Sequence, residues 1–311
     1  NGAGTNPNPS TYKTTDADIT LVNPSKPGYE FNGWSCSVTQ TSGTPHDPMN
    51  TVISTGSYGD LEFTASWKEK ENITINYTAE GHGKVSLASE SLAPVTGTAV
   101  GSTATADAGY HFVNWTNEAG VQVSTSTTFV PAKVDGLNVA ATYIAHFEED
   151  PNVTITYEAK VGGIVSRETE TLPPATGEAQ GSEAKAAAGY HFVNWTNEAG
   201  EEVATSETFI PAKVNGLNVA ATYYANFEEN EKITIKYVAR KGGSVNPASE
   251  TLKPATDVAT GSTATASAGY YFVNWTNEGG EVLGTNEVFV PEKVGGVNVA
   301  ATYYANFAEK E

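Results

Sequence analysis

Histidine is the side chain best suited to metal binding or to proton transfer near neutral pH. The chain has five histidines, and comparing the chain with itself at a spacing of 80 residues aligns them. His111 and His191 share one position, which holds Tyr271 in the next copy, and His146 corresponds to Asn226. A ligand position would not alternate between imidazole and phenol or amide, so we expect no metal ligands.

Carboxylates and one thiol are the other groups that could carry chemistry. Glu118, Glu198 and Glu278 recur, but each lies in an Asn-Glu-x-Gly segment, where a solvated turn residue is the ordinary explanation. The sequence has no Asp-x-Asp-x-Asp-Gly calcium loop. Cys36 is the only cysteine, which excludes an intramolecular disulfide and a cysteine-based zinc site. We interpret Cys36 as a small buried side chain or a stray thiol.

Motifs for nucleophilic or phosphate chemistry are missing from the sequence. It contains no Gly-x-Ser-x-Gly, no His-Glu-x-x-His, no glycine loop for phosphate and no Cys/His pair in a supporting context. Asn-x-Thr triplets begin at Asn72, Asn114 and Asn152, and we attribute these to chance in strands rich in Asn and Thr. We therefore expect no catalytic residues, no cofactor-binding residues and no enzymatic activity.

Composition and charge narrow the choice of partners. The formal net charge of −19 repels phosphate backbones and anionic lipid, which argues against nucleic acid and membrane surfaces as partners. Hydrophobic residues make up 39% of the chain, enough for several small cores. No apolar run has the length of a membrane span. Because the chain begins at Asn1 and not at methionine, we expect it to be a piece of a longer protein.

The elements that position these side chains come in repeats. Trp115, Trp195 and Trp275 are 80 residues apart, and the segment from Gly109 to Gly120 recurs letter for letter at 189–200. This period predicts three modules, at residues 71–150, 151–230 and 231–311. The connectors between modules are short and charged, too short to act as flexible tethers. We expect a monomeric, extended rod of four modules, each about 30 to 40 Å long.

Residues 1–70 form a diverged fourth module. Gly28, Tyr29, Phe31 and Trp34 reproduce the Gly-Tyr-x-Phe-x-x-Trp spacing of the repeats. The segment Asn1–Gly4 resembles the glycine-rich turn that follows the first strand of each repeat, so we expect this module to lack its first strand. Its sheet edge is then either exposed or paired to a neighbouring molecule, or residues 1–22 fold back to fill the gap.

Period-two alternation dominates each module and predicts a mainly β fold. Ile73, Ile75 and Tyr77 alternate with polar residues and lead to a tight turn at 81–83. The segment Pro131–Gly136 is expected to form at most one helical turn. Tyr110, Phe112 and Trp115 are expected in the core and not on a sugar-stacking surface. Tyr223 and Tyr224 must face opposite sides of their strand, which makes the exposed one the best candidate for a contact surface.

The first module resembles the Listeria-Bacteroides repeat, through the segment GYEFNGW and the closing LEFTASW. The GYxFVNW modules are similar to its divergent relative, the internalin-type B repeat. The resemblance implies β-grasp-like modules in wall-anchored surface proteins of Gram-positive and related bacteria, without catalytic residues. It favours a stalk that projects a distal binding domain from the cell wall. Two alternatives stay open: repeats that bind host glycan or host protein multivalently, and a non-catalytic appendage of a secreted enzyme.

A covalent cross-link is a further hypothesis from the sequence. Lys236 on the first strand of the third repeat and Asn306 on the last are expected on neighbouring strands. An isopeptide bond between them would release ammonia. The equivalent pairs in the other repeats lack a lysine, so only this module could form the bond.

Overall fold

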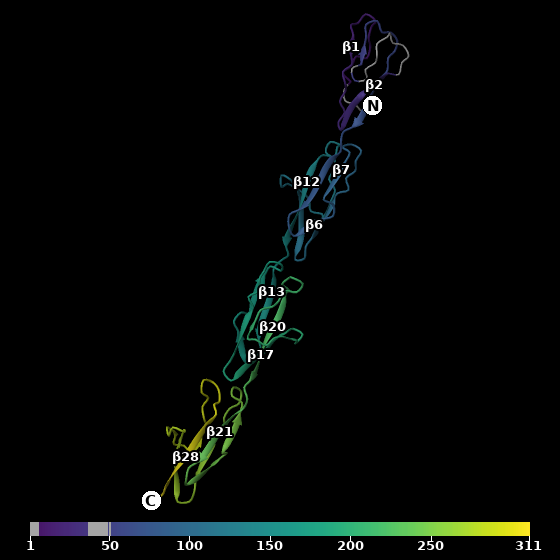
Figure 1. The fold of residues 1–311 in the computed structure, drawn as a ribbon. Helices are drawn as coiled ribbons and strands as arrows, with labels where there is room; N and C mark the ends of the chain where they lie inside the picture. Colours follow the sequence, from purple (N-terminus) through teal and green to yellow (C-terminus); the bar gives the residue numbers. More distant parts are fainter. Residues whose placement is uncertain (1–5, 37–48, 50) are drawn as a thin grey trace. The chain divides into compact units, whose positions relative to one another are not determined.

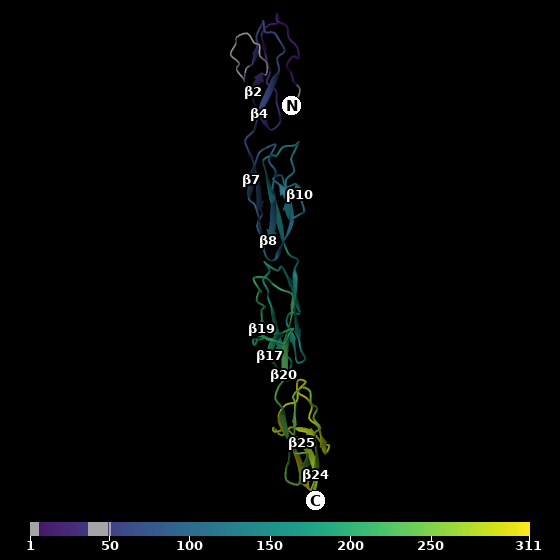
Figure 2. The same ribbon diagram turned by 90° about the vertical axis from the view of Figure 1, so that its right-hand side faces the viewer.

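The computed structural model describes residues 6–36, 49 and 51–311. Every regular element in these residues is a β-strand, as both ribbon views show (Figure 1, Figure 2). This confirms the mainly β fold. The chain divides into two compact units, Asn1–Asp150 and Pro151–Glu311. The first unit holds the N-terminal module and the first repeat, and the second unit holds the other two repeats.

Each repeat contains a five-stranded sheet and a three-stranded sheet. In the first repeat the larger sheet has the order β10-β9-β12-β5-β7 and the smaller has the order β11-β8-β6. The strands are β5 (Ile73–Ala79), β6 (Gly83–Val85), β7 (Ser89–Leu92), β8 (Ser102–Ala106), β9 (Tyr110–Asn117), β10 (Gln122–Ser124), β11 (Thr128–Phe129) and β12 (Ala141–Glu149).

The second and third repeats reproduce both sheets. In the second repeat the strands are β13 (Val153–Ala159), β14 (Gly163–Val165), β15 (Thr169–Leu172), β16 (Ser182–Ala186), β17 (Tyr190–Asn197), β18 (Glu202–Ala204), β19 (Thr208–Phe209) and β20 (Ala221–Glu229). In the third they are β21 (Ile233–Ala239), β22 (Gly243–Asn246), β23 (Ser249–Leu252), β24 (Ser262–Ala266), β25 (Tyr270–Thr276), β26 (Val282–Gly284), β27 (Val288–Phe289) and β28 (Ala301–Glu309).

The first and last strands of a repeat lie side by side and parallel, as in a β-grasp sheet. In the first repeat this pairing turns Ile75 and Tyr77 toward the space between the two sheets, where both are buried. Trp115 fills the centre of that space with no exposed surface, and its ring meets Tyr77 edge-on at 6.1 Å. Ala104, from the smaller sheet, leaves room for the rings. The predicted aromatic core is therefore confirmed.

The three-residue step from Phe112 to Trp115 does not fit a regular strand, in which alternate residues share a face. The register between β9 and β12 shifts there, because Phe147 pairs with Phe112 but His146 pairs with Asn114. Val113 is the extra residue of a β-bulge, which brings both rings to the core side. The second and third repeats have the same shift.

Two local expectations were wrong. The turn at 81–83 does not join a hairpin, since β5 and β6 belong to different sheets and the turn carries the chain from one to the other. The segment 131–136 holds no helical turn. Val134 and Leu137 form an isolated antiparallel bridge around Asp135 and Gly136, which have φ of 49° and 79°. Positive φ at both central residues is typical of a type I′ turn.

The N-terminal module keeps only part of this plan. Its strands are β1 (Ile19–Thr20), β2 (Tyr29–Cys36), β3 (Val52–Ile53) and β4 (Phe63–Glu69), which form the pairs β1-β3 and β2-β4. Leu21, Trp34 and Ile53 make a small core. Tyr12 packs against that core, and its hydroxyl donates to the Gly59 carbonyl, so part of the segment before β1 folds back onto the module. The expected turn at Asn1–Gly4 lies outside the described residues.

The proposed cross-link does not fit the register of the third repeat. β21 and β28 are neighbours, as expected, but Lys236 pairs with Thr302. Asn306 lies four residues further along β28, about 13 Å away at the rise of a strand. Its amide instead donates to Asn274 Oδ1 at 2.9 Å and to Thr276 Oγ1 at 3.1 Å. The cross-link hypothesis is therefore wrong for this structure.

Candidate functional site

The most elaborate polar arrangement lies where one module meets the next. In the first unit, Glu69 at the end of β4 reaches a loop of the first repeat. Its Oε1 accepts hydrogen bonds from the backbone N–H of Val95 at 2.6 Å and of Thr96 at 2.9 Å. Its Oε2 accepts from the Thr96 hydroxyl at 2.8 Å. One carboxylate thus holds three donors of the neighbouring module, and we name this arrangement the junction clamp.

The second unit contains the same junction clamp between its two repeats. Glu229, at the end of β20, accepts from the N–H groups of Ala255 at 2.7 Å and Thr256 at 2.8 Å, and from the Thr256 hydroxyl at 2.8 Å. The Glu229 side chain is only 9% exposed, and Lys253 Nζ lies 3.8 Å from its Oε2. The geometry of the clamp is therefore a property of the repeat and not of one junction.

The clamp favours the ionised carboxylate. The backbone hydrogen bond from Thr96 is the main reason that the pKa of Glu69 lies below its ordinary value, and it outweighs the opposing effect of burial. For Glu229, burial acts to raise the pKa, but the hydrogen bonds from Thr256 and Ala255 and the charge of Lys253 lower it overall. Both glutamates therefore act as charged acceptors, which form the stronger class of hydrogen bond.

The loop that receives the clamp is held in shape by its own module. Asn138 is buried, and its side-chain amide donates to the carbonyls of Ala93 at 2.9 Å and Gly97 at 3.0 Å. Lys133 donates to the carbonyl of Val95, the residue whose N–H meets Glu69. Asn298 and Lys293 bond the corresponding loop of the third repeat. The loop is therefore preorganised for the incoming carboxylate.

A glycine of the Gly-Tyr motif packs against the same loop. Gly28 has a φ of +76°, and a Cβ there would lie 2.3 Å from a methyl of Val95 and 2.8 Å from a methyl of Leu137. Gly189 has a φ of +83°, and a Cβ there would lie 3.0 Å from Val297 and 3.1 Å from Ala255. Both the positive φ and the close approach favour glycine at this position.

The sequence analysis missed the junction clamp, although two signals in the sequence point to it. Glutamate recurs every 80 residues, at Glu69, Glu149, Glu229 and Glu309. Threonine recurs at the receiving position, at Thr96, Thr176 and Thr256. A glutamate that ends one module and a threonine that follows in the next are informative only as a pair, because each alone is an ordinary surface residue.

Each repeat also has a buried tyrosine bonded to a glutamate. The hydroxyl of Tyr77 donates to Glu90 at 2.5 Å, and the pairs Tyr157–Glu170 and Tyr237–Glu250 match it. Burial and the adjacent carboxylate raise the pKa of the Tyr157 hydroxyl. Burial acts to raise the pKa of Glu170, but hydrogen bonds from Tyr157 and from the N–H groups of Gln180 and Gly181 lower it overall. The pair stays neutral tyrosine and charged glutamate, which suits stability and not proton transfer.

The histidines and turn glutamates singled out in the sequence do not come together. His111 Nδ1 lies 3.1 Å from Asp150, and His146 lies between Thr116 and Glu80. Glu118 is exposed in its turn. His46 lies outside the described residues. Within the described ranges, no group of three His, Cys, Asp or Glu side chains is placed to hold a metal ion. In the same residues no helix is long and apolar enough to cross a membrane.

Tyr223 and Tyr224 face opposite sides of β20, as predicted. Tyr223 faces the core, where its ring stacks with Tyr157 at 6.2 Å. Tyr224 lies on the outer face under Lys160, whose Nζ is 3.6 Å from the ring centre. Arg240 covers Tyr304 in the same way in the third repeat. The outer tyrosines are therefore half covered by a cation, and the first repeat has Ile144 at this position.

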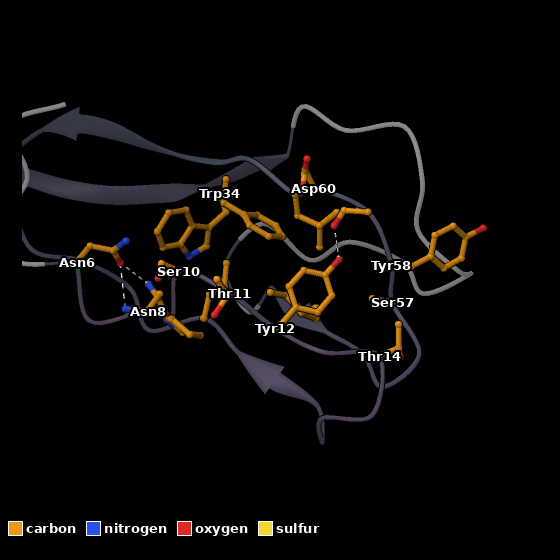
Figure 3. A pocket seen from close by; sticks show the side chains of 16 residues that line it. Asn6, Asn8, Ser10, Thr11, Tyr12, Thr14, Trp34, Ser57, Tyr58 and Asp60 are labelled. Atoms are coloured by element: carbon orange, nitrogen blue, oxygen red, sulfur yellow. Dashed lines mark hydrogen bonds between the residues drawn. The ribbon is translucent and has the colours of Figure 1, made fainter.

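The N-terminal module contains a cavity of about 460 Å³ beside Trp34. Figure 3 shows Trp34 on one wall and the segment with Asn8, Ser10 and Tyr12 on the other. In the first repeat, Tyr77 packs between Trp115 and Tyr143, and the counterparts of those two rings, Trp34 and Phe63, line this cavity. The cavity is the space that the repeats fill with a core tyrosine, so we do not assign it a ligand.

Comparison with known proteins places both kinds of module. The family model of the divergent InlB B-repeat domain matches residues 73–151, 153–231 and 233–310. The model of the Listeria-Bacteroides repeat domain matches residues 1–58. No curated protein matches the chain. Both families are repeats of bacterial surface proteins, so this chain is a repeat region of such a protein. The chain belongs to the divergent InlB B-repeat family, with a Listeria-Bacteroides repeat ahead of its three B repeats.

Proposed function

We propose that this chain is the stalk of a wall-anchored, adhesin-like surface protein and that it holds a distal binding domain away from the cell wall. The junction clamp carries this proposal. A stalk must resist bending where its modules join, and Glu69 and Glu229 tie each module to the next through three hydrogen bonds. A region that only strung binding modules together would not need a charged acceptor at each junction.

The remaining features fit a mechanical role. Buried tryptophans and Tyr–Glu pairs give every repeat its own core, so each repeat is a separate unit of stability. The net charge of −19 keeps neighbouring stalks apart through repulsion. A stalk of this kind has no catalytic residues, in line with the expectation from the sequence.

A distance measurement across one junction tests the proposal. Spin labels on cysteines placed at Lys185 and Thr265, both exposed and at equivalent positions in two repeats, report the distance between those repeats. Cys36 is first replaced by serine so that only the two labels react. We expect one narrow distance distribution in the parent protein. Glu229→Ala should broaden it, because the receiving loop loses its acceptor.

Glu228→Ala is the matched control, since Glu228 is exposed and adjacent to Glu229 in the chain. It removes the same charge without touching the junction clamp, so the narrow distribution should persist. A parent distribution that is already broad, or one that Glu229→Ala leaves unchanged, would contradict a stalk stiffened at its junctions.

A further inference from the structure

The third repeat has an open groove that the stalk function does not use. Its volume is about 800 Å³. β26 and the turn 277–279 line one side, β27 and residues 290–292 line the other, and the start of β28 also contributes. Grooves of this size are typical of sites that bind ligands.

Apolar side chains dominate this groove. Leu283, Val288 and Val290 line it and are 38%, 57% and 48% exposed, so they present apolar surface to solvent. Phe289 and Tyr303 contribute aromatic rings. Apolar surface that is gathered in a concave site is more informative than scattered exposed valines, because a ligand can bury it from several sides.

Two carboxylates give the groove its charge. Glu278 and Glu292 line it, both are exposed, and neither forms an ion pair in the part of the chain that the structure describes. No lysine or arginine is among the lining residues. A bound partner therefore gains most if it carries positive charge at both ends of an apolar contact.

Three of the lining residues are special to the third repeat. Gly284 stands where the other repeats have Ser124 and Ala204. Ala204 packs against the core of its repeat, so its methyl takes up space that Gly284 leaves open. The third repeat also has Val288 in place of threonine, at Thr128 and Thr208, and Glu292 in place of alanine, at Ala132 and Ala212. The differences add depth, apolar surface and charge at one place.

We propose that this groove binds an extended, basic peptide segment of a partner protein. β26 is the edge strand of the larger sheet, so its outer side offers backbone groups to an added strand. An apolar side chain of the peptide enters the space over Gly284. Lysine or arginine residues on either side of it pair with Glu278 and Glu292. The third repeat is then a docking module as well as part of the stalk.

Calorimetric titration of the full chain with three short peptides tests this proposal. The probes are the capped peptides Lys-Val-Lys-Val-Lys, Glu-Val-Glu-Val-Glu and penta-lysine. We expect Lys-Val-Lys-Val-Lys to bind saturably with one site per chain. The acidic peptide should not bind, and penta-lysine should bind more weakly because it cannot fill the apolar groove. Glu292→Ala should weaken binding of the first peptide by about two- to fivefold.

The second repeat supplies matched variants. Gly284→Ala, Val288→Thr and Glu292→Ala give the third repeat the residues that the second repeat already carries, so the variants are compatible with the fold. The triple variant should lose binding while its thermal unfolding stays close to that of the parent. Glu198→Gln, in the second repeat, should leave binding unchanged.

Several results would overturn the proposal. One is equal binding of penta-lysine and Lys-Val-Lys-Val-Lys, which would show attraction to a generally acidic surface. Binding of three peptides per chain would have the same meaning. Full binding by the triple variant, or no binding by the parent protein, would rule out this groove as a peptide site.

Discussion

The N-terminal module and the three repeats build the same antiparallel pair around the same tryptophan, but they enclose that tryptophan differently. β2 pairs with β4 as β9 pairs with β12, with a similar register shift. In the repeats a parallel strand adds Ile75 and Tyr77 beside Trp115, which has no exposed surface. In the described residues of the N-terminal module no strand pairs with the other edge of β4, and Trp34 borders a cavity.

This difference separates what identifies a module from what stabilises it. The Gly-Tyr-x-Phe-x-x-Trp segment specifies the hairpin and its bulge, and both kinds of module have it. A closed core needs more, namely an added strand with the pattern Ile-x-Ile-x-Tyr and a glutamate that accepts from the tyrosine. The comparison predicts that equivalent substitutions have larger effects in the repeats than in the N-terminal module.

Replacing the core tryptophan should have the largest effect. Trp195→Ala removes a side chain with no exposed surface and should cost about 3 to 5 kcal/mol of unfolding free energy. That loss is comparable to the total stability of a small module. Trp34→Ala should cost less, because Trp34 already borders a cavity and has fewer neighbours to lose. Hydrogen exchange read by mass spectrometry, module by module, measures both.

The same measurement tests whether modules unfold independently. Trp195→Ala should raise exchange throughout 151–230, and strands of the third repeat away from the junction should stay protected. Phe209→Leu, a milder change in the same core, serves as the graded control. Loss of protection in all three repeats together would contradict the model of independent cores.

The repeats, their strands and their aromatic core could be predicted from the sequence because periodicity reports burial directly. Ile75 and Tyr77 alternate with polar residues, and only one face of a strand can be core. The pairing of strands could not be predicted this way. The turn at 81–83 looks like a hairpin turn, yet it leads to a second sheet, since tertiary packing decides where the next strand goes.

Other features were available in the sequence but lacked a local signal strong enough to read. The pairs Asp135-Gly136 and Asn215-Gly216 are typical of type I′ turns and should have argued against a helical turn. The junction clamp was harder to predict, because Glu69 and Thr96 are far apart in the chain and each looks like an ordinary polar residue. A contact between modules has no periodicity of its own.

The Tyr–Glu pair should give the next largest effect. Tyr157→Phe removes the hydroxyl donor from a buried carboxylate and should cost about 1 to 3 kcal/mol. Glu170 keeps its hydrogen bonds from Gln180 and Gly181, which limits the loss. Denaturant unfolding of the variant and the parent measures it. Tyr190→Phe, outside the core cluster, is the control and should have little effect.

The pH dependence of stability should follow the same pair. The pKa of Glu170 is lower in the folded protein than its ordinary value of 4.5. The stabilisation is therefore complete above about pH 4.5 and is lost as the pH falls through the folded pKa below that value. Thermal unfolding between pH 2 and pH 7 should show this decline. In Glu170→Gln the curve should be flatter in the acid range for the second repeat, and an unchanged slope would contradict the assignment.

The smallest effect concerns a difference among the repeats themselves. In the second repeat Asn226 donates to Asn194 Oδ1, but in the first repeat His146 occupies that position, and Asn114 Oδ1 is buried without a hydrogen-bond partner. His146 instead contacts Thr116 and Glu80. His146→Asn should supply the missing donor and stabilise the first repeat by about 0.5 to 1.5 kcal/mol. Denaturant unfolding measures the gain, and Glu80→Gln controls for the lost ion pair, which is partly exposed and should contribute little. If His146→Asn destabilised the repeat by as much as it is expected to stabilise it, the contact with Glu80 would matter more than the unpaired oxygen.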